Sequence, residues 1–154
     1  MRQDLQTDIL IELHIPDFEP AKQFYGALGY EIVWEKAPHE QDGYLVMRSG
    51  GSILNFYGGK EHIYAHPFFR RFRRDTPRGY GVEIIIPITD IGTFYQRFLA
   101  LYPDSVVKEL NHTFSHPDFR ATDPFGFYLR FVERYNWVDG RDTRGVPRRQ
   151  SRHK

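Results

Sequence analysis

The side chains that could support chemistry are few, and three of them lie within apolar stretches. Glu12 and His14 interrupt the alternating segment 9–15, and Glu83 interrupts the apolar segment 81–88. Two carboxylates can act as general acid and base, although nothing in the sequence selects a substrate for them. The other six histidines fall on predicted loops and lack the spacing of metal ligands on a helix: they are His39, His62, His66, His112, His116 and His153.

Other classes of chemistry are excluded by residue type. The chain has no cysteine, which rules out disulfides, zinc ribbons, iron–sulfur centres and thiol nucleophiles. The glycines of segments 50–52 and 58–60 lack the remainder of a phosphate-binding loop, so we interpret them as turn residues.

Charge is distributed unevenly over the 154 residues. Segments 66–78 and 141–154 hold 11 of the 21 basic residues and two of the 20 acidic ones, so the rest carries 10 basic and 18 acidic residues. We expect the cluster from Arg70 to Arg74 to be a solvated linker helix or loop with Phe68, Phe69 and Phe72 packed beneath it. The tail has almost no apolar residues, and we expect it to be disordered or to lie on a partner subunit. Bases on two appendages, rather than on one folded face, argue against a nucleic-acid partner.

Nothing in the sequence indicates a membrane or a secretion signal. The longest apolar run, residues 84–88, is far shorter than the roughly 18 residues of a membrane span, and no apolar segment of a signal peptide follows the first residues. We therefore expect a cytoplasmic protein with no membrane partner.

The elements that position these residues follow from hydrophobic periodicity. Alternation predicts a strand over 9–15, with Glu12 and His14 on its mixed face, and apolar spacing predicts a helix from Glu19 that stops at Gly29. The first half continues with three predicted strands, over residues 30–36, 44–48 and 52–57. The second half repeats the plan, with strands over 81–88, 105–110, 118–122 and 127–133 and a helix over 90–102.

The duplicated order β-α-β-β-β and several motifs resemble the vicinal oxygen chelate superfamily of glyoxalases, extradiol dioxygenases and bleomycin-resistance proteins. The motifs are Ile15-Pro16-Asp17, the run from Phe24 to Tyr30, the hairpin residues 43–46, and the stretch 119–126 with its Asp-Pro-x-Gly turn. The resemblance implies an α+β fold in which two modules, about 8–59 and 79–134, form a curled mixed-sheet cup with helices outside. Residues 1–134 would be one domain, 60–78 its linker and 135–154 a basic tail.

Strand parity then predicts which side chains face the cup. Leu10, Glu12 and His14 would point inward from the first strand, and Glu83 and Ile85 from the fifth. Inward positions on two further strands are Ile53, Asn55 and Tyr57, and Tyr128, Arg130 and Val132.

Metal-dependent relatives carry their ligands at four places that the resemblance puts at Leu10, Asn55, Glu83 and Arg130. Leucine donates nothing, a guanidinium cannot coordinate a cation and an amide is a poor ligand for a transition metal. We therefore expect no metal and no cofactor. A displaced site of Glu12, His14 and Glu83 is the alternative, although Glu12 or Glu83 could instead pair with Arg130.

The unfilled ligand set is most similar to the bleomycin-resistance branch, whose dimers sequester a drug without altering it. We expect a homodimer that binds a bulky, aromatic, cationic small molecule, and we favour binding over catalysis. The alternative is a metal-dependent glyoxalase- or dioxygenase-type enzyme, and a third hypothesis is a scaffold whose basic segments bind an anionic partner. The predicted ligand-binding residues are Glu12, His14, Trp34, Tyr44, Asn55, Tyr57, Glu83, Phe114 and Arg130.

Overall fold

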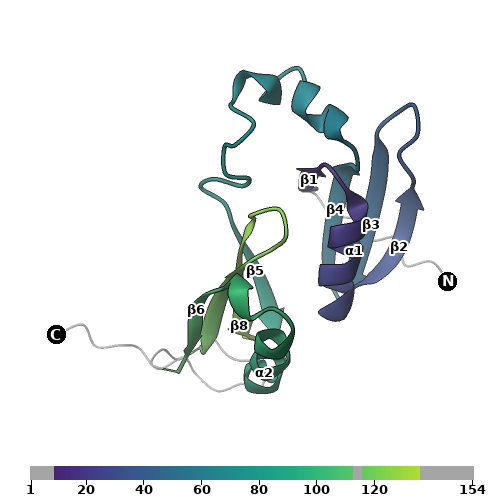
Figure 1. Cartoon of the computed structure of the whole chain (residues 1–154). Coiled ribbons are helices and arrows are strands. Elements are labelled where there is room, and N and C mark those ends of the chain that lie inside the picture. The colour runs from purple at the N-terminus through teal and green to yellow at the C-terminus, as the bar shows by residue number, and fades with distance from the viewer. Residues whose placement is uncertain (1–8, 113–115, 136–154) are drawn as a thin grey trace. The chain divides into compact units, whose positions relative to one another are not determined.

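The computed structural model describes residues 9–112 and 116–135, and it divides the chain into two compact units with their boundary between Thr76 and Pro77. Each unit is a β-α-β-β-β module, shown in Figure 1 with its helix against its own sheet. The first comprises β1 (Glu12–Ile15), α1 (Phe18–Ala27), β2 (Glu31–Lys36), β3 (Gly43–Ser49) and β4 (Ser52–Gly58). The second comprises β5 (Glu83–Ile88), α2 (Ile91–Leu101), β6 (Val106–Asn111), β7 (Asp118–Thr122) and β8 (Tyr128–Glu133). The described residues also form the short 3-10 turns η1 (Glu61–Ala65), η2 (Phe69–Arg71) and η3 (Pro103–Ser105).

The two sheets have the same topology. Their strand orders are β1-β4-β3-β2 and β5-β8-β7-β6, and in each the first strand runs parallel to the last while the other pairs are antiparallel. Neither sheet closes on itself. The predicted α+β class with two β-α-β-β-β modules is therefore confirmed.

Each core lies between a helix and one face of its sheet. In the first module the fully buried Tyr25 of α1 packs on Phe56 of β4, with 5.4 Å between ring centroids. In the second, Phe98 of α2 lies 5.2 Å from Phe119 and 5.4 Å from Phe131. Burial of these aromatic rings supplies much of the hydrophobic stabilisation, and the opposite face of each sheet is not covered by a helix of its own module.

Helix caps and turns explain the motifs found in the sequence. The Asp17 carboxylate accepts from the backbone N of Glu19 at 2.9 Å, which caps α1. In the Asp-Pro-x-Gly turn the buried Asp123 Oδ1 accepts from the backbone N of Phe125 and of Phe127, both at 2.9 Å. The Glu133 carboxylate accepts from the backbone N of Ile91 at 2.9 Å, which joins the start of α2 to the end of β8.

The first strand is shorter than predicted, and this corrects the inward placement of Leu10. Pairing with β4 begins at Glu12, while Ile9, Leu10 and Ile11 precede the strand and are 76%, 67% and 65% exposed. Where the ladder stops, the Ile11 carbonyl accepts from the side chain of Asn55 at 3.3 Å.

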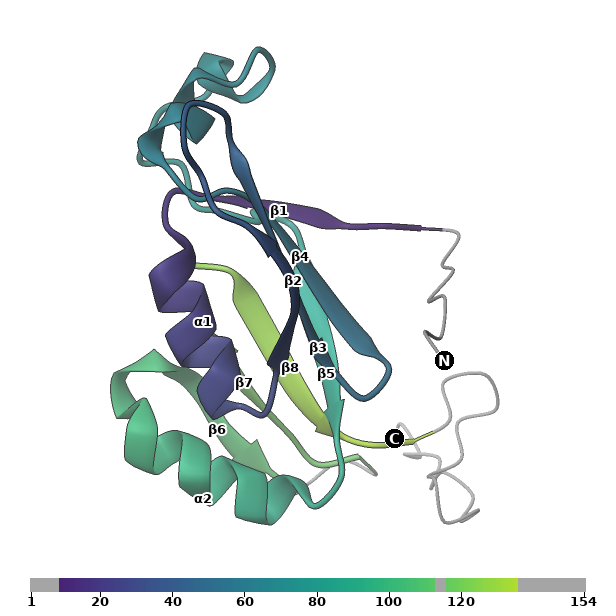
Figure 2. The same ribbon diagram turned by 90° about the vertical axis from the view of Figure 1, so that its right-hand side faces the viewer.

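The linker is also different from the prediction, because Phe68, Phe69 and Phe72 are 49%, 45% and 52% exposed rather than packed beneath the arginines. Turns as short as η2 cannot present a continuous apolar face, and Arg71 instead lies over the Phe68 ring, 4.2 Å from its centroid. Figure 2 shows this part of the linker at the same end of the first sheet as the loop that joins β2 and β3.

No helix in the described part of the chain has the length and apolarity to cross a membrane. The prediction for the basic tail falls mostly on residues 136–154, which lie outside the described residues.

Candidate functional site

The helix-free face of the first sheet gathers most of the predicted ligand-binding side chains. Residues paired directly across neighbouring strands lie on the same face. Two such rows cross this face: Trp34, Val46, Asn55 and Glu12 form one, and Lys36, Tyr44, Tyr57 and His14 form the other. Strand parity grouped Glu12, His14, Asn55 and Tyr57 on one side of their strands, and the register places them on this shared face of the sheet.

His14 is the centre of this group. Its Nε2 lies 2.9 Å from Glu12 Oε1, and its ring centroid lies 4.7 Å from that of Tyr57. Burial, together with the negative charge of Glu12, raises the pKa of the Tyr44 hydroxyl. The carboxylate therefore lies near aromatic rings and is paired with His14.

Trp34 extends the aromatic surface outward. Its side chain is 53% exposed and its ring lies 5.7 Å from that of Tyr44, which is in turn 6.5 Å from Tyr57. Asn55, in contrast, is buried and its amide donates to the Ile11 carbonyl. The face thus offers a ladder of rings that begins at solvent and ends beside Glu12.

Sequence reasoning missed two residues that border this face, Phe69 and His66. The Phe69 and His66 rings each lie 5.2 Å from the His14 ring at nearly right angles, and they stack on one another at 4.5 Å. The His66 Nδ1 accepts from the backbone N of Phe68 and of Phe69, which fixes the turn that carries Phe69. No periodic signal in the linker could have indicated this contact, because the segment is irregular.

Sequence reasoning also missed Asp42, which lies between β2 and β3. Its Oδ2 accepts from the Tyr57 hydroxyl at 2.8 Å and lies 3.4 Å from His62 Nδ1, while Lys60 lies 3.9 Å from Oδ1. Burial would raise the pKa of Asp42, but the hydrogen bonds from Tyr57 and His62 and the nearby positive charges outweigh it and lower that pKa. The hydrogen bond raises the pKa of Tyr57 in turn. Asp42 thereby fixes the Tyr57 ring on the site.

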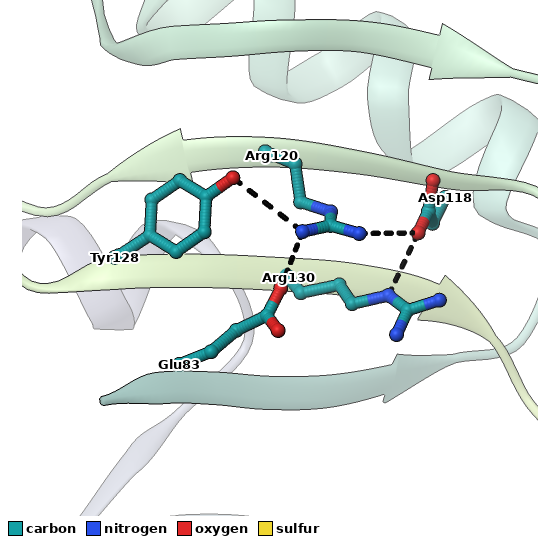
Figure 3. Close-up of polar contacts among 5 residues, drawn as sticks. All are labelled: Glu83, Asp118, Arg120, Tyr128 and Arg130. Carbon is teal, nitrogen blue, oxygen red and sulfur yellow. Dashed lines mark hydrogen bonds and ion pairs between the residues drawn. The ribbon is translucent and has the colours of Figure 1, made fainter. Parts of the chain in front are cut away.

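The helix-free face of the second sheet is polar rather than aromatic (Figure 3). Arg120 Nη1 donates to Glu83 Oε1 at 2.6 Å, and its Nη2 donates to Asp118 Oδ2 at 3.2 Å. The Nε of Arg130 donates to the same Asp118 oxygen at 2.7 Å. The alternative that Glu83 pairs with Arg130 is therefore wrong, since Glu83 pairs with Arg120 and Arg130 with Asp118.

The positions discussed as metal ligands are engaged in other contacts. Leu10 precedes its strand, the Asn55 amide bonds the backbone, and Glu83 and Arg130 belong to the ion-pair network. Within residues 9–112 and 116–135, no three acidic or histidine side chains gather as a metal site would require. Phe114, the remaining predicted ligand-binding residue, lies outside the described residues.

Comparison with known proteins identifies the fold. No protein-family model matches the sequence, and no curated protein matches it either. Among solved structures, a hypothetical protein from S. aureus is 19% identical with a TM-score of 0.62, covering 83% of this chain and 95% of its own.

Two further solved structures have names that bear on function. A putative glyoxalase family protein from Bacillus anthracis is 21% identical with a TM-score of 0.56, covering 86% of this chain and 98% of its own. A bleomycin-binding protein complexed with bleomycin is 20% identical with a TM-score of 0.53, covering 82% and 98%. The chain thus has the fold of the vicinal oxygen chelate superfamily, as the sequence resemblance predicted.

Proposed function

We propose that this protein binds a bulky, aromatic, cationic small molecule on the helix-free face of its first sheet and releases it unchanged. The observation that carries the proposal is the Glu12 carboxylate, which lies 2.9 Å from His14 Nε2, on a face where the His14 ring contacts that of Tyr57. A carboxylate attracts a cation, and aromatic faces stabilise both the cation and its ring system.

Three further features support a cationic ligand. Trp34 and Tyr44 provide a partly exposed surface on which a planar group could stack. Outside the two basic segments the chain is acidic, with 18 acidic against 10 basic residues, and such a surface attracts cations over a distance. The fold is shared with a protein that binds bleomycin. The proposal includes a cytoplasmic homodimer that sequesters an antibiotic of this class.

Calorimetry against a small panel tests the proposal. The probes are bleomycin, the planar cation 1-methylquinolinium, and 1-methylnaphthalene as its uncharged shape analogue. We expect saturable heat from at least one cation, a weaker response from the uncharged analogue, and recovery of the ligand at unchanged mass. No heat from either cation would overturn the proposal.

A metal-dependent enzyme is the competing function, because glyoxalase family proteins share the fold. We place it second because of the side chains at the four positions where the resemblance puts metal ligands. Leu10 has no donor atom, Asn55 and Glu83 are engaged in other bonds, and Arg130 is a cation. Elemental analysis of the purified protein separates the two functions. About one transition metal per chain, together with turnover of a thiol conjugate or a catechol, would establish the enzyme.

A further inference from the structure

The polar face of the second sheet is organised around one buried carboxylate. The Asp118 side chain is only 4% exposed, and its Oδ2 accepts from both Arg130 Nε and Arg120 Nη2. A carboxylate at this depth needs such partners, because removing it from water is costly. Asp118 therefore fixes the positions of two guanidinium groups.

The guanidinium groups of Arg120 and Arg130 differ in how many of their N–H donors are free to bind a ligand. Both terminal nitrogens of Arg120 are used, Nη1 by Glu83 and Tyr128 and Nη2 by Asp118. Burial would lower the pKa of Arg120, but the bond to Tyr128 and the charges of Glu83 and Asp118 outweigh it and raise that pKa. We interpret Arg120 as a structural cross-link.

Arg130 is held through its Nε alone. Its two Nη atoms have no acceptor among the described residues, although the side chain is only 25% exposed. In Figure 3 the terminal nitrogens of Arg130 point away from Arg120 and Glu83. The guanidinium of Arg130 is thus fixed at Nε, and the edge formed by its two Nη atoms presents parallel N–H donors.

Asp118 is the anion beside this guanidinium, and it is shared between Arg130 and Arg120. The carboxylates of Glu83 and Asp118 are matched by Arg120 and Arg130, and Lys108 is paired opposite Arg120 on β6. The other residues of this face near Arg130 are uncharged: Ile85 lies opposite it on β5, and Tyr128 and Val132 flank it on β8. The row across the sheet is cationic overall.

We propose that the terminal nitrogens of Arg130 bind the oxyanion of a small molecule, a carboxylate or a phosphate group. The planar guanidinium matches two oxygens of such a group with two parallel hydrogen bonds. This site goes beyond the proposed function, because it lies on the second module, takes the opposite charge and does not involve Glu12.

The test uses the full chain and two probes, benzoate and inorganic phosphate, titrated at low ionic strength. Side-chain arginine signals in NMR report on Arg130 directly, and calorimetry gives the affinity. Arg130→Lys keeps the charge but loses the paired donors, so we expect about tenfold weaker binding, and Arg130→Gln should abolish saturable binding. Arg70→Lys is the matched control, because Arg70 is exposed on the linker.

The outcomes distinguish a carboxylate ligand from a phosphate ligand, and they test this site separately from the proposed cation binding. A response of the Arg130 signals to benzoate, to phosphate or to both supports the site and names its chemistry. Unchanged Arg130 signals in the wild-type protein with both probes would overturn it, as would an equal loss of affinity in Arg70→Lys. Binding of 1-methylquinolinium should be the same in Arg130→Lys as in the wild type, so failure of one proposal does not imply failure of the other.

Discussion

Glu12 and His14 lie two residues apart on one face of β1, with 2.9 Å between Glu12 Oε1 and His14 Nε2. This bond orients the carboxylate toward the ring ladder formed by Tyr57, Tyr44 and Trp34. A ligand cation would therefore meet a negative charge that is already positioned, which reduces the entropy lost on binding.

The linker contributes to binding through Phe69. Phe69→Ala removes a ring 5.2 Å from His14 and should weaken binding of 1-methylquinolinium by about 1 kcal/mol. Stability should change little, since Phe69 is 45% exposed. Phe72→Ala is the control because that ring is exposed to a similar degree, at 52%, and its ring contact is with Phe68 rather than with His14. Equal affinities of the two variants in calorimetry would show that Phe69 does not border the site.

Asp42 should make the stability of the fold fall as the pH is lowered into the acid range. Because folding lowers the pKa of its carboxyl below the ordinary 3.8, its stabilisation is complete at neutral pH and is lost from about pH 5 downward, as the carboxyl takes up a proton in the folded state. Asp42→Asn should thus be less stable than the wild type at pH 7 and lose less stability between pH 7 and pH 3. Urea denaturation at several pH values measures both, with the exposed Asp104→Asn as control. Parallel pH curves for wild type and Asp42→Asn would contradict this role.

The two carboxylates of the second sheet should differ in their effect on stability. Asp118→Asn leaves two guanidinium groups poorly paired around a side chain that is 4% exposed, so a loss of about 3 kcal/mol is expected. Glu83→Gln affects a side chain that is 33% exposed, and solvent screening should limit its cost to about 1 kcal/mol. Thermal and urea denaturation measure the loss of stability in both variants. A larger loss of stability in Glu83→Gln than in Asp118→Asn would refute the network as described.

Self-association should involve the exposed apolar residues that precede β1. Ile9, Leu10 and Ile11 adjoin an edge strand, and such edges are commonly covered by another chain. Light scattering at micromolar concentration should give twice the chain mass of 18.3 kDa. Leu10→Lys should shift the protein toward the monomer, whereas Leu101→Lys, at an exposed position on α2, should not. A wild-type monomer would rule out the dimer.

Most helices and strands could be predicted from the sequence, because hydrophobic alternation and turn motifs are set by residues close together in the chain. Alternation and the Asp-Pro-x-Gly turn placed β7 at Asp118–Thr122 correctly, and the positive φ of Gly29, 95°, explains why that glycine marks the end of α1. Parity also put Glu12 and His14 on the helix-free face. The fold and one face of the site were therefore accessible from the sequence.

The remaining features depend on contacts between distant residues. The pairing of Glu83 with Arg120 requires the register of three strands, which alternation within one strand does not contain. Phe69 reaches His14 from an irregular segment more than fifty residues away along the chain, and nothing in its surrounding sequence indicates that direction. Polar networks and linker contacts were for this reason missed or wrongly assigned.

The central claim is that Glu12, rather than Glu83, provides the charge that binds a cation. Calorimetry with 1-methylquinolinium on the wild type, Glu12→Gln and Glu83→Gln tests it most directly. Glu12→Gln should weaken binding by roughly 1–3 kcal/mol, while Glu83→Gln, whose carboxylate is already paired with Arg120, should stay within about 0.5 kcal/mol of the wild type. Unchanged affinity in Glu12→Gln, or an equal loss in both variants, would contradict the account.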